Sequence, residues 1–139
     1  MTASRPSNVL AVRALHGAIF IGLVMITAVF AFLVYRADTP MLVSQPLLGL
    51  GLAVAGLGVL AVAVVILRPR LPKRGNDQSP EDYWDMGMRR RVLMVWVTVE
   101  LAGLSAAMGY LLSGEQAALV VAVLAISTMG WFRPGRLEG

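Results

Sequence analysis

Cysteine is absent from the 139-residue sequence, and charged residues are scarce, at 14% of the chain. Without cysteine there is no disulfide framework, thiolate metal site or cysteine nucleophile, although the redox compartment stays open. The sequence also lacks a glycine-rich phosphate loop, a nucleophile elbow, zinc-ligand spacing and a pair of catalytic carboxylates. We therefore expect no enzymatic activity and no cofactor.

Apolar residues dominate what is present, at 58% of the chain with a mean hydropathy of +0.73. A helix needs about 20 apolar residues to cross about 30 Å of hydrocarbon. The sequence predicts one all-α domain over residues 1–139, a four-helix transmembrane bundle with spans at 14–35, 47–67, 92–114 and 116–132. The fourth span is the shortest, so it must use interfacial residues, stand upright or thin the bilayer.

The basic residues predict the orientation of these spans. If the N-terminus is cytoplasmic, Arg36 is the one basic residue outside, and eleven of the 12 lie inside: Arg5, Arg13, Arg68, Arg70, Lys73, Arg74, Arg89, Arg90, Arg91, Arg133 and Arg136. Both termini and the loop 68–91 are then cytoplasmic. Topology explains these charges, so we expect no nucleic-acid partner. The first span is too long for a signal-peptide core, and we interpret it as an uncleaved anchor.

Local signals predict how the third helix begins and ends. Gly114 suits a left-handed C-cap in a tight turn, which would make the third and fourth helices adjacent and antiparallel. Ser79, Pro80 and Asp82 match a helix N-cap, first position and capping box. We expect one unbroken helix from Pro80 to Leu112. The alternative is a break at Gly87, with Tyr83 and Trp84 as interfacial anchors. This piece is either a solvated helix start or a docking site for a cytoplasmic partner.

Glu100 is the one acidic residue in the third span, nine residues after Arg91 and therefore ~13 Å deep along a helix. An ionisable residue near the membrane centre costs about 2.5 to 3.5 kcal/mol on insertion scales and rarely faces lipid. Trp96, Gly103 and Ala107 share its side of the helix. Because desolvation disfavours the charged form, we expect a protonated carboxyl inside the bundle. It would act as a hydrogen bonder or as a proton carrier.

Three polar residues are candidate partners for Glu100. Ser127 and Thr128 lie ~8 to 9 Å deep by residue count and match its depth better than His16, at ~4 to 5 Å. His16 would need a second ligand from a partner chain to hold haem, and it has no nearby companion for a metal. We expect an interfacial histidine that bonds a headgroup, water or a neighbouring helix, and no metal site.

Small residues mark possible helix contacts. The second span contains small pairs four residues apart, Gly51 with Ala55 and Gly49 with Ala53, together with Gly56 and Gly58. Such pairs let helices approach closely in membranes. We expect this surface to pack against the face of the third span that carries Gly103 and Ala107.

Two resemblances follow from these segments. The stretch "GLGLAVAGLGVLA" followed by Glu100 in "VTVELAGLSAAMGYLL" resembles the hairpin of the proteolipid c subunits of rotary ATPases. That likeness implies proton or cation translocation through Glu100. It covers two of the four spans, and the inner loop here is longer and lacks the short Arg-Gln/Asn-Pro turn of that family.

The whole chain, including "ALHGAIFIGLVM", "VELAGLSAAMGYLLSGE" and "WFRPGRLEG", resembles small four-span bacterial membrane proteins of uncharacterised function. This likeness implies a multi-pass protein of the bacterial inner membrane. We expect an accessory or scaffold subunit that acts through helix–helix contacts, as a homo-oligomer or within a larger membrane complex. The alternative is proteolipid-like ion translocation.

Overall fold

The protein is all-helical in the residues that the computed structural model describes, 8–37 and 46–137. Its long helices are α1 (Asn8–Ala37), α2 (Pro46–Ala61), α4 (Met86–Ser113) and α5 (Gln116–Trp131). α2 continues through a π-helical turn, η1 (Val62–Leu67), and a 3₁₀ turn, η2 (Arg68–Arg70). Two one-turn helices, α3 (Pro80–Tyr83) and α6 (Pro134–Leu137), complete the described elements.

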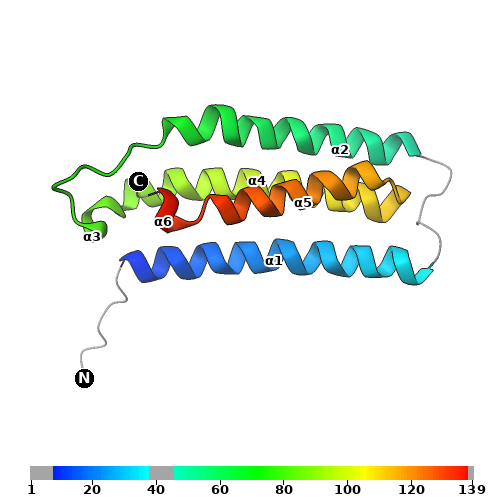
Figure 1. Ribbon diagram of the computed structural model, residues 1–139, viewed down its shortest axis with the longest axis horizontal. Helices are drawn as coiled ribbons and strands as arrows, with labels where there is room; N and C mark the ends of the chain where they lie inside the picture. Colours follow the sequence, from blue (N-terminus) through cyan, green and yellow to red (C-terminus); the bar gives the residue numbers. More distant parts are fainter. Residues whose placement is uncertain (1–7, 38–45, 138–139) are drawn as a thin grey trace, which may run out of the picture.

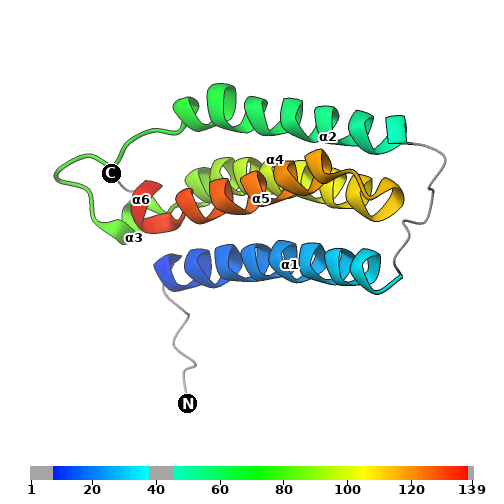
Figure 2. The same ribbon diagram turned by 45° about the vertical axis from the view of Figure 1, so that its right-hand side comes forward.

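The helices form three layers. α4 and α5 lie together in the middle, α2 lies on one side of this pair, and α1 lies on the other (Figures 1 and 2). We call the end that carries α3 and α6 the polar end, and the opposite end, where α4 turns into α5, the turn end. α4 is the central helix: half of its most apolar 18-residue stretch is buried, against 22% for Pro46–Arg70 and 11% for α1.

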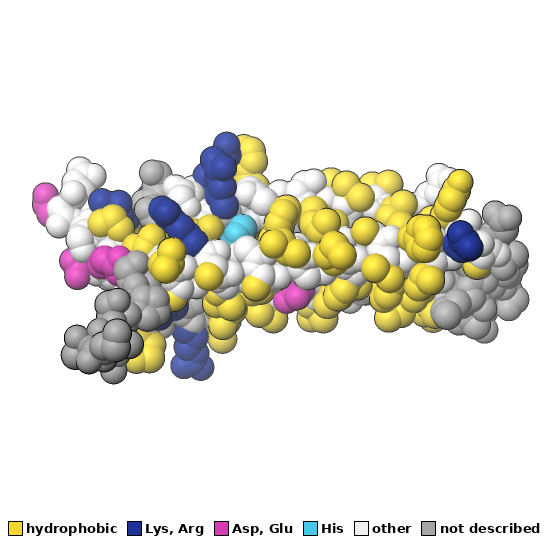
Figure 3. Space-filling view, turned by 90° about the horizontal axis from the view of Figure 1, so that it is seen from below, with side chains coloured by type: hydrophobic (Ala, Val, Ile, Leu, Met, Phe, Trp, Pro, Cys, Tyr) yellow, Lys and Arg dark blue, Asp and Glu magenta, His cyan; other side chains and the backbone are white. Residues whose placement is uncertain are grey.

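Within residues 8–37 and 46–137, three helices are long and apolar enough to cross a membrane: α1 with 30 residues, Pro46–Arg70 with 25 and α4 with 28. α5 has 16 residues, which corresponds to ~24 Å at a rise of 1.5 Å per residue. Hydrophobic side chains dominate the middle of the face in Figure 3, and most charged side chains gather towards the polar end. The four predicted apolar ranges lie within these helices, apart from Gly114 and Phe132 just after α4 and α5, and both α1 and α4 begin six residues before the predicted range.

The predicted unbroken helix from Pro80 is wrong. α3 ends at Tyr83, and Asp85 starts α4 as a new N-cap whose carboxylate accepts a hydrogen bond from Met88 N at 2.6 Å. The alternative break at Gly87 is also wrong, because Gly87 lies within the first turn of α4. The backbone turns at Trp84 instead, since the Asp85 carboxylate offers the amides of α4 a competing start.

The predicted caps on either side of this break are present. Ser79 Oγ accepts a hydrogen bond from Asp82 N at 3.1 Å and donates one to the Asp82 carboxylate at 2.5 Å. Gly114 takes the left-handed conformation, with φ of 70°, and its N–H donates to Tyr110 O at 2.8 Å. This turn brings α4 and α5 together as antiparallel neighbours, as predicted.

The buried residues form two cores that differ in composition. The polar-end core contains large side chains from every described helix, among them Trp84, Trp96, Leu23, Met129 and Phe132. The turn-end core consists of one valine and five alanines from α2, α4 and α5: Ala53, Ala106, Ala107, Ala118, Val121 and Ala122. The helices therefore approach through bulky groups at one end and through small groups at the other.

Candidate functional site

Glu100 lies near the middle of α4 and is half-buried. Trp96, one turn before it on α4, donates its indole N–H to Phe132 O on α5 at 2.9 Å. Because α4 and α5 are antiparallel, the residue one turn after Trp96 is level with the residue one turn before Phe132. Glu100 is thus level with Thr128 and its neighbour Ser127.

The expected hydrogen bond between Glu100 and these hydroxyls is not formed. Ser127 Oγ donates to Val123 O at 2.9 Å, and Thr128 Oγ1 donates to Leu124 O at 2.8 Å, so both hydroxyls bond to their own helix. The Glu100 carboxyl makes no hydrogen bond to any residue in the described ranges. Equal depth does not bring these groups together, since Ser127 is exposed, Thr128 is half-buried, and each hydroxyl bonds to the backbone of its own helix.

His16 is buried at the contact between α1, α4 and α5, with 9% of its surface exposed. Its Nε2 donates to Met129 O at 3.0 Å. The ring lies edge-on to Trp96, with centroids 4.8 Å apart, and is stacked with Phe20 at 6.2 Å. The predicted hydrogen bond to a neighbouring helix is therefore present. His16 is buried among the helices and does not lie at an exposed surface.

The hydrogen bonds that His16 and Trp96 donate satisfy backbone carbonyls at the C-terminal end of α5. The last four carbonyls of a helix have no partner within the helix. Here the carbonyls of Met129 and Phe132 accept bonds from side chains of α1 and α4, respectively. Sequence reasoning missed the donor role of Trp96. The signal was its indole N–H, which needs an acceptor once the ring is buried.

Small residues bring α2 and α4 into close contact, as expected. A Cβ added to Gly56 would lie 2.8 Å from Ala102 O, and one added to Gly109 would lie 3.0 Å from Gly49 O. A Cβ on Gly49 would overlap Ser113 Oγ. A side chain at Gly49 or Gly56 would therefore push α2 away from α4, and one at Gly109 would need its neighbours to shift by a few tenths of an ångström.

Gly51, Ala55 and Gly58 do not take part in this contact, contrary to prediction. All three are exposed, and a Cβ on Gly51 or Gly58 would meet nothing within 4 Å. α2 contains the four-residue spacing of small residues twice, once from Gly49 and once from Gly51. The set that packs against α4 is the one that begins at Gly49. Two residues correspond to ~200° around a helix, so the predicted set lies on the opposite face.

Gly103 and Ala107 are buried, but Gly103 faces partners other than α2. A Cβ on Gly103 would lie 2.8 Å from Leu23 Cδ1 of α1 and 3.1 Å from Ala125 Cβ of α5. Ala107 belongs to the turn-end core. The predicted pairing of Gly103 with the second span is therefore corrected: this side of α4 packs against α1 and α5.

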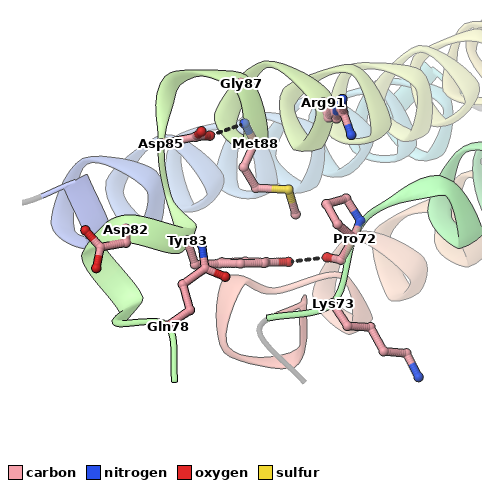
Figure 4. A pocket seen from close by; sticks show the side chains of 9 residues that line it. All are labelled: Pro72, Lys73, Gln78, Asp82, Tyr83, Asp85, Gly87, Met88 and Arg91. Carbon is pink, nitrogen blue, oxygen red and sulfur yellow. Dashed lines mark hydrogen bonds between the residues drawn. The ribbon is translucent and has the colours of Figure 1, made fainter. Parts of the chain in front are cut away.

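A pocket of about 230 Å³ opens at the polar end, between the loop after η2 and the start of α4 (Figure 4). Tyr83 forms one wall, and its hydroxyl lies 2.9 Å from Pro72 O and 3.0 Å from Leu137 O. Arg91 of α4 and Lys73 of the loop after η2 also line this pocket. Tyr83 and Trp84 are buried in the polar-end core and are not exposed interfacial anchors.

Comparisons with protein-family models, curated proteins and solved structures found no match. The chain is therefore classified by its own features: in its described ranges it is all-helical, with three helices long and apolar enough to cross a membrane. Glu100 on α4 and the exposed Arg70, Arg90 and Arg91 of the polar end are features that the contacts among the described residues leave unexplained.

Proposed function

We propose that the chain is a four-span protein of the bacterial inner membrane whose termini and loop 68–91 are cytoplasmic. The eleven-to-one distribution of basic residues supports this orientation. α5 serves as the fourth span together with interfacial residues at its ends. Reporter fusions at Gly75 and Gly139 should report the cytoplasmic side. Reporters that are active on the outer side would overturn the orientation.

Within this membrane, the protein acts as an accessory or scaffold subunit through helix–helix contacts with a second copy or a larger complex. The observation that carries this proposal is the half-buried Glu100 carboxyl, which lies at mid-span and has no hydrogen-bond partner among the described residues. Leaving such a group against lipid costs about 2.5 to 3.5 kcal/mol on insertion scales. A contacting helix that supplies a polar partner removes most of this cost.

The surroundings of Glu100 suit such a contact. Its neighbour Leu101 is 55% exposed, and Met108, two turns further along α4, is 40% exposed. These side chains offer an apolar surface around a single polar group. Interhelical hydrogen bonds in membranes add about 0.6 to 2 kcal/mol to van der Waals packing. The carboxyl would then select and orient the partner.

Two substitutions of Glu100 test this role. Glu100→Gln keeps size and hydrogen bonding, whereas Glu100→Leu removes the polar group. In protein extracted with a mild detergent, the size of the assembly should be unchanged for Glu100→Gln and reduced for Glu100→Leu. An unchanged assembly in both variants would contradict a contact through Glu100.

Proton or cation translocation is the second candidate, because a carboxyl without a fixed partner can also load and release a proton. Sealed vesicles that contain the purified protein and a pH gradient distinguish the two. On the scaffold proposal, the gradient decays equally with the parent chain and Glu100→Gln. A decay that the parent accelerates and Glu100→Gln abolishes would favour translocation. No enzymatic activity, cofactor or nucleic-acid partner is proposed.

A further inference from the structure

A groove runs along the outside of the contact between the end of α2 and the start of α4. Its central hollow, of about 290 Å³, is lined by Leu67, Arg70, Leu71, Arg91, Met94 and Val95. A second hollow, of about 520 Å³, shares Leu67 and Met94 with it and extends along α4 to Val97 and Thr98. The pocket in Figure 4 shares Arg91 and continues it at the polar end. We call the first two hollows the seam groove.

The two ends of the seam groove differ in chemistry. Towards the turn end its walls are apolar, formed by Leu67, Met94 and Val97. Towards the polar end it is bordered by Arg70, Arg90 and Arg91. From Arg91 to Val97 is six residues, or ~9 Å along the helix. The groove therefore passes from a cationic rim to an apolar floor along the direction of the proposed span.

The rim arginines have no partners within the described part of the chain. Arg70, Arg90 and Arg91 are exposed, and none makes an ion pair or a side-chain hydrogen bond there. Other arginines of the polar end are engaged: Arg89 donates to Trp84 O at 3.1 Å, and the guanidinium of Arg136 lies 3.9 Å from the ring centre of Trp131. These three unpaired arginines thus border the groove, where a bound anion would neutralise their charge.

We propose that the seam groove binds an anionic phospholipid. The phosphate lies between Arg70 and Arg91, with Arg90 at the edge, and one acyl chain follows Met94 and Val97. Guanidinium groups match phosphate oxygens with paired, charge-assisted hydrogen bonds. Basic pockets between spanning helices on the cytoplasmic side are suited to lipid headgroups. The proposal depends on the membrane placement of the chain and not on the role of Glu100.

The test uses the purified full-length chain in mild detergent and measures its melting temperature. Phosphatidylglycerol and phosphatidylcholine with the same acyl chains are added in parallel, and inorganic phosphate is added in a third series. Phosphatidylglycerol should raise the melting temperature more than either of the others. Equal shifts with the two lipids would overturn the proposal, and an equal shift with phosphate would mean an anion site without a lipid.

Substitutions locate the effect in the groove. In the double variant Arg70→Gln, Arg91→Gln the phosphatidylglycerol concentration for half-maximal stabilisation should rise at least about tenfold. Arg13→Gln, on exposed α1 at the same end, is the matched control and should leave it unchanged. Equal losses in the control would indicate a general charge effect and contradict the site.

A second variant tests the apolar half and does not depend on charge. Met94→Trp should fill the groove and weaken stabilisation by phosphatidylglycerol, whereas Ile21→Trp on the exposed face of α1 should not. Both positions are exposed, so either variant should fold. If Met94→Trp and Ile21→Trp behave alike, the acyl chain does not lie in the seam groove.

Discussion

The polar end and the turn end of this protein hold the same four long helices together by different means. At the polar end, large side chains such as Trp84, Trp96 and Met129 fill the core, and side chains bond to backbone carbonyls across helices. At the turn end, alanines and glycines let the backbones approach closely. In lipid, helix association depends on packing and hydrogen bonds because lipid tails are as apolar as the side chains. The polar end relies mainly on hydrogen bonds between helices, and the turn end relies mainly on close packing.

The difference matches what each end must do. At the polar end α5 stops short, and the carbonyls it leaves need donors, which His16 and Trp96 supply from α1 and α4. At the turn end, the left-handed Gly114 and a two-residue connection keep α4 and α5 close, so only small residues fit between them and α2. Substitutions should therefore act through steric overlap at one end and through lost bonds at the other.

The largest effect should come from adding bulk at the turn-end contact. In Gly56→Leu the first added carbon would already lie 2.8 Å from Ala102 O, a backbone atom that cannot move without separating α2 from α4. We expect a loss of about 3 kcal/mol in the free energy of unfolding. Gly58→Leu is the control, since its Cβ meets nothing within 4 Å, and it should change stability by less than about 0.5 kcal/mol. Unfolding in mixed detergent micelles measures both. Equal losses would mean that α2 does not use this face.

A smaller effect should come from removing one bond at the polar end. Trp96→Phe keeps an aromatic ring in the core but leaves Phe132 O without the indole N–H. The expected loss is about 1 to 2 kcal/mol. Trp131→Phe is the matched control, because Trp131 is exposed and its indole is not part of the core. If both variants lose the same stability in the same unfolding assay, the interhelical bond contributes nothing measurable.

The smallest effect should be a gain. Thr27 is buried in α1, and its hydroxyl has no hydrogen-bond partner among residues 8–37 and 46–137. Thr27→Val has nearly the same shape and removes this unpaired group, so we expect stability to rise by up to about 1 kcal/mol. Thr98→Val should give no gain, because the Thr98 hydroxyl already donates to Met94 O at 2.7 Å. A loss of stability in Thr27→Val would show that the hydroxyl has a partner in the membrane.

Hydropathy predicted the long helices because runs of this length have few other solutions, and Ser79 and Gly114 predicted the start of α3 and the end of α4 correctly. The face of α2 could not be predicted in the same way. α2 is apolar on all sides and repeats its small-residue spacing from Gly49 and again from Gly51, so only the packing against α4 distinguishes the two faces.

The break before α4 and the surroundings of Glu100 were also beyond sequence reasoning. Asp85 is an N-cap residue, but the acidic and aromatic residues before it suit a helix equally well. Residue counting gave depths of ~13 Å for Glu100 and ~8 to 9 Å for Thr128, whereas the bond between Trp96 and Phe132 places the two residues level. Counting could not give the direction in which either side chain points, because this depends on the rotation of α4 and α5 about their own axes.

Cross-linking from the Glu100 side of α4 in native membranes tests the central claim most directly. A photoreactive residue at Leu101 should yield a cross-linked product of one discrete mass, which persists in Glu100→Gln and is lost in Glu100→Leu. The same residue at Ile21 of α1 or Val54 of α2, both exposed, should yield none. Products of the same mass from all three positions, or none from Leu101, would contradict a specific contact at Glu100.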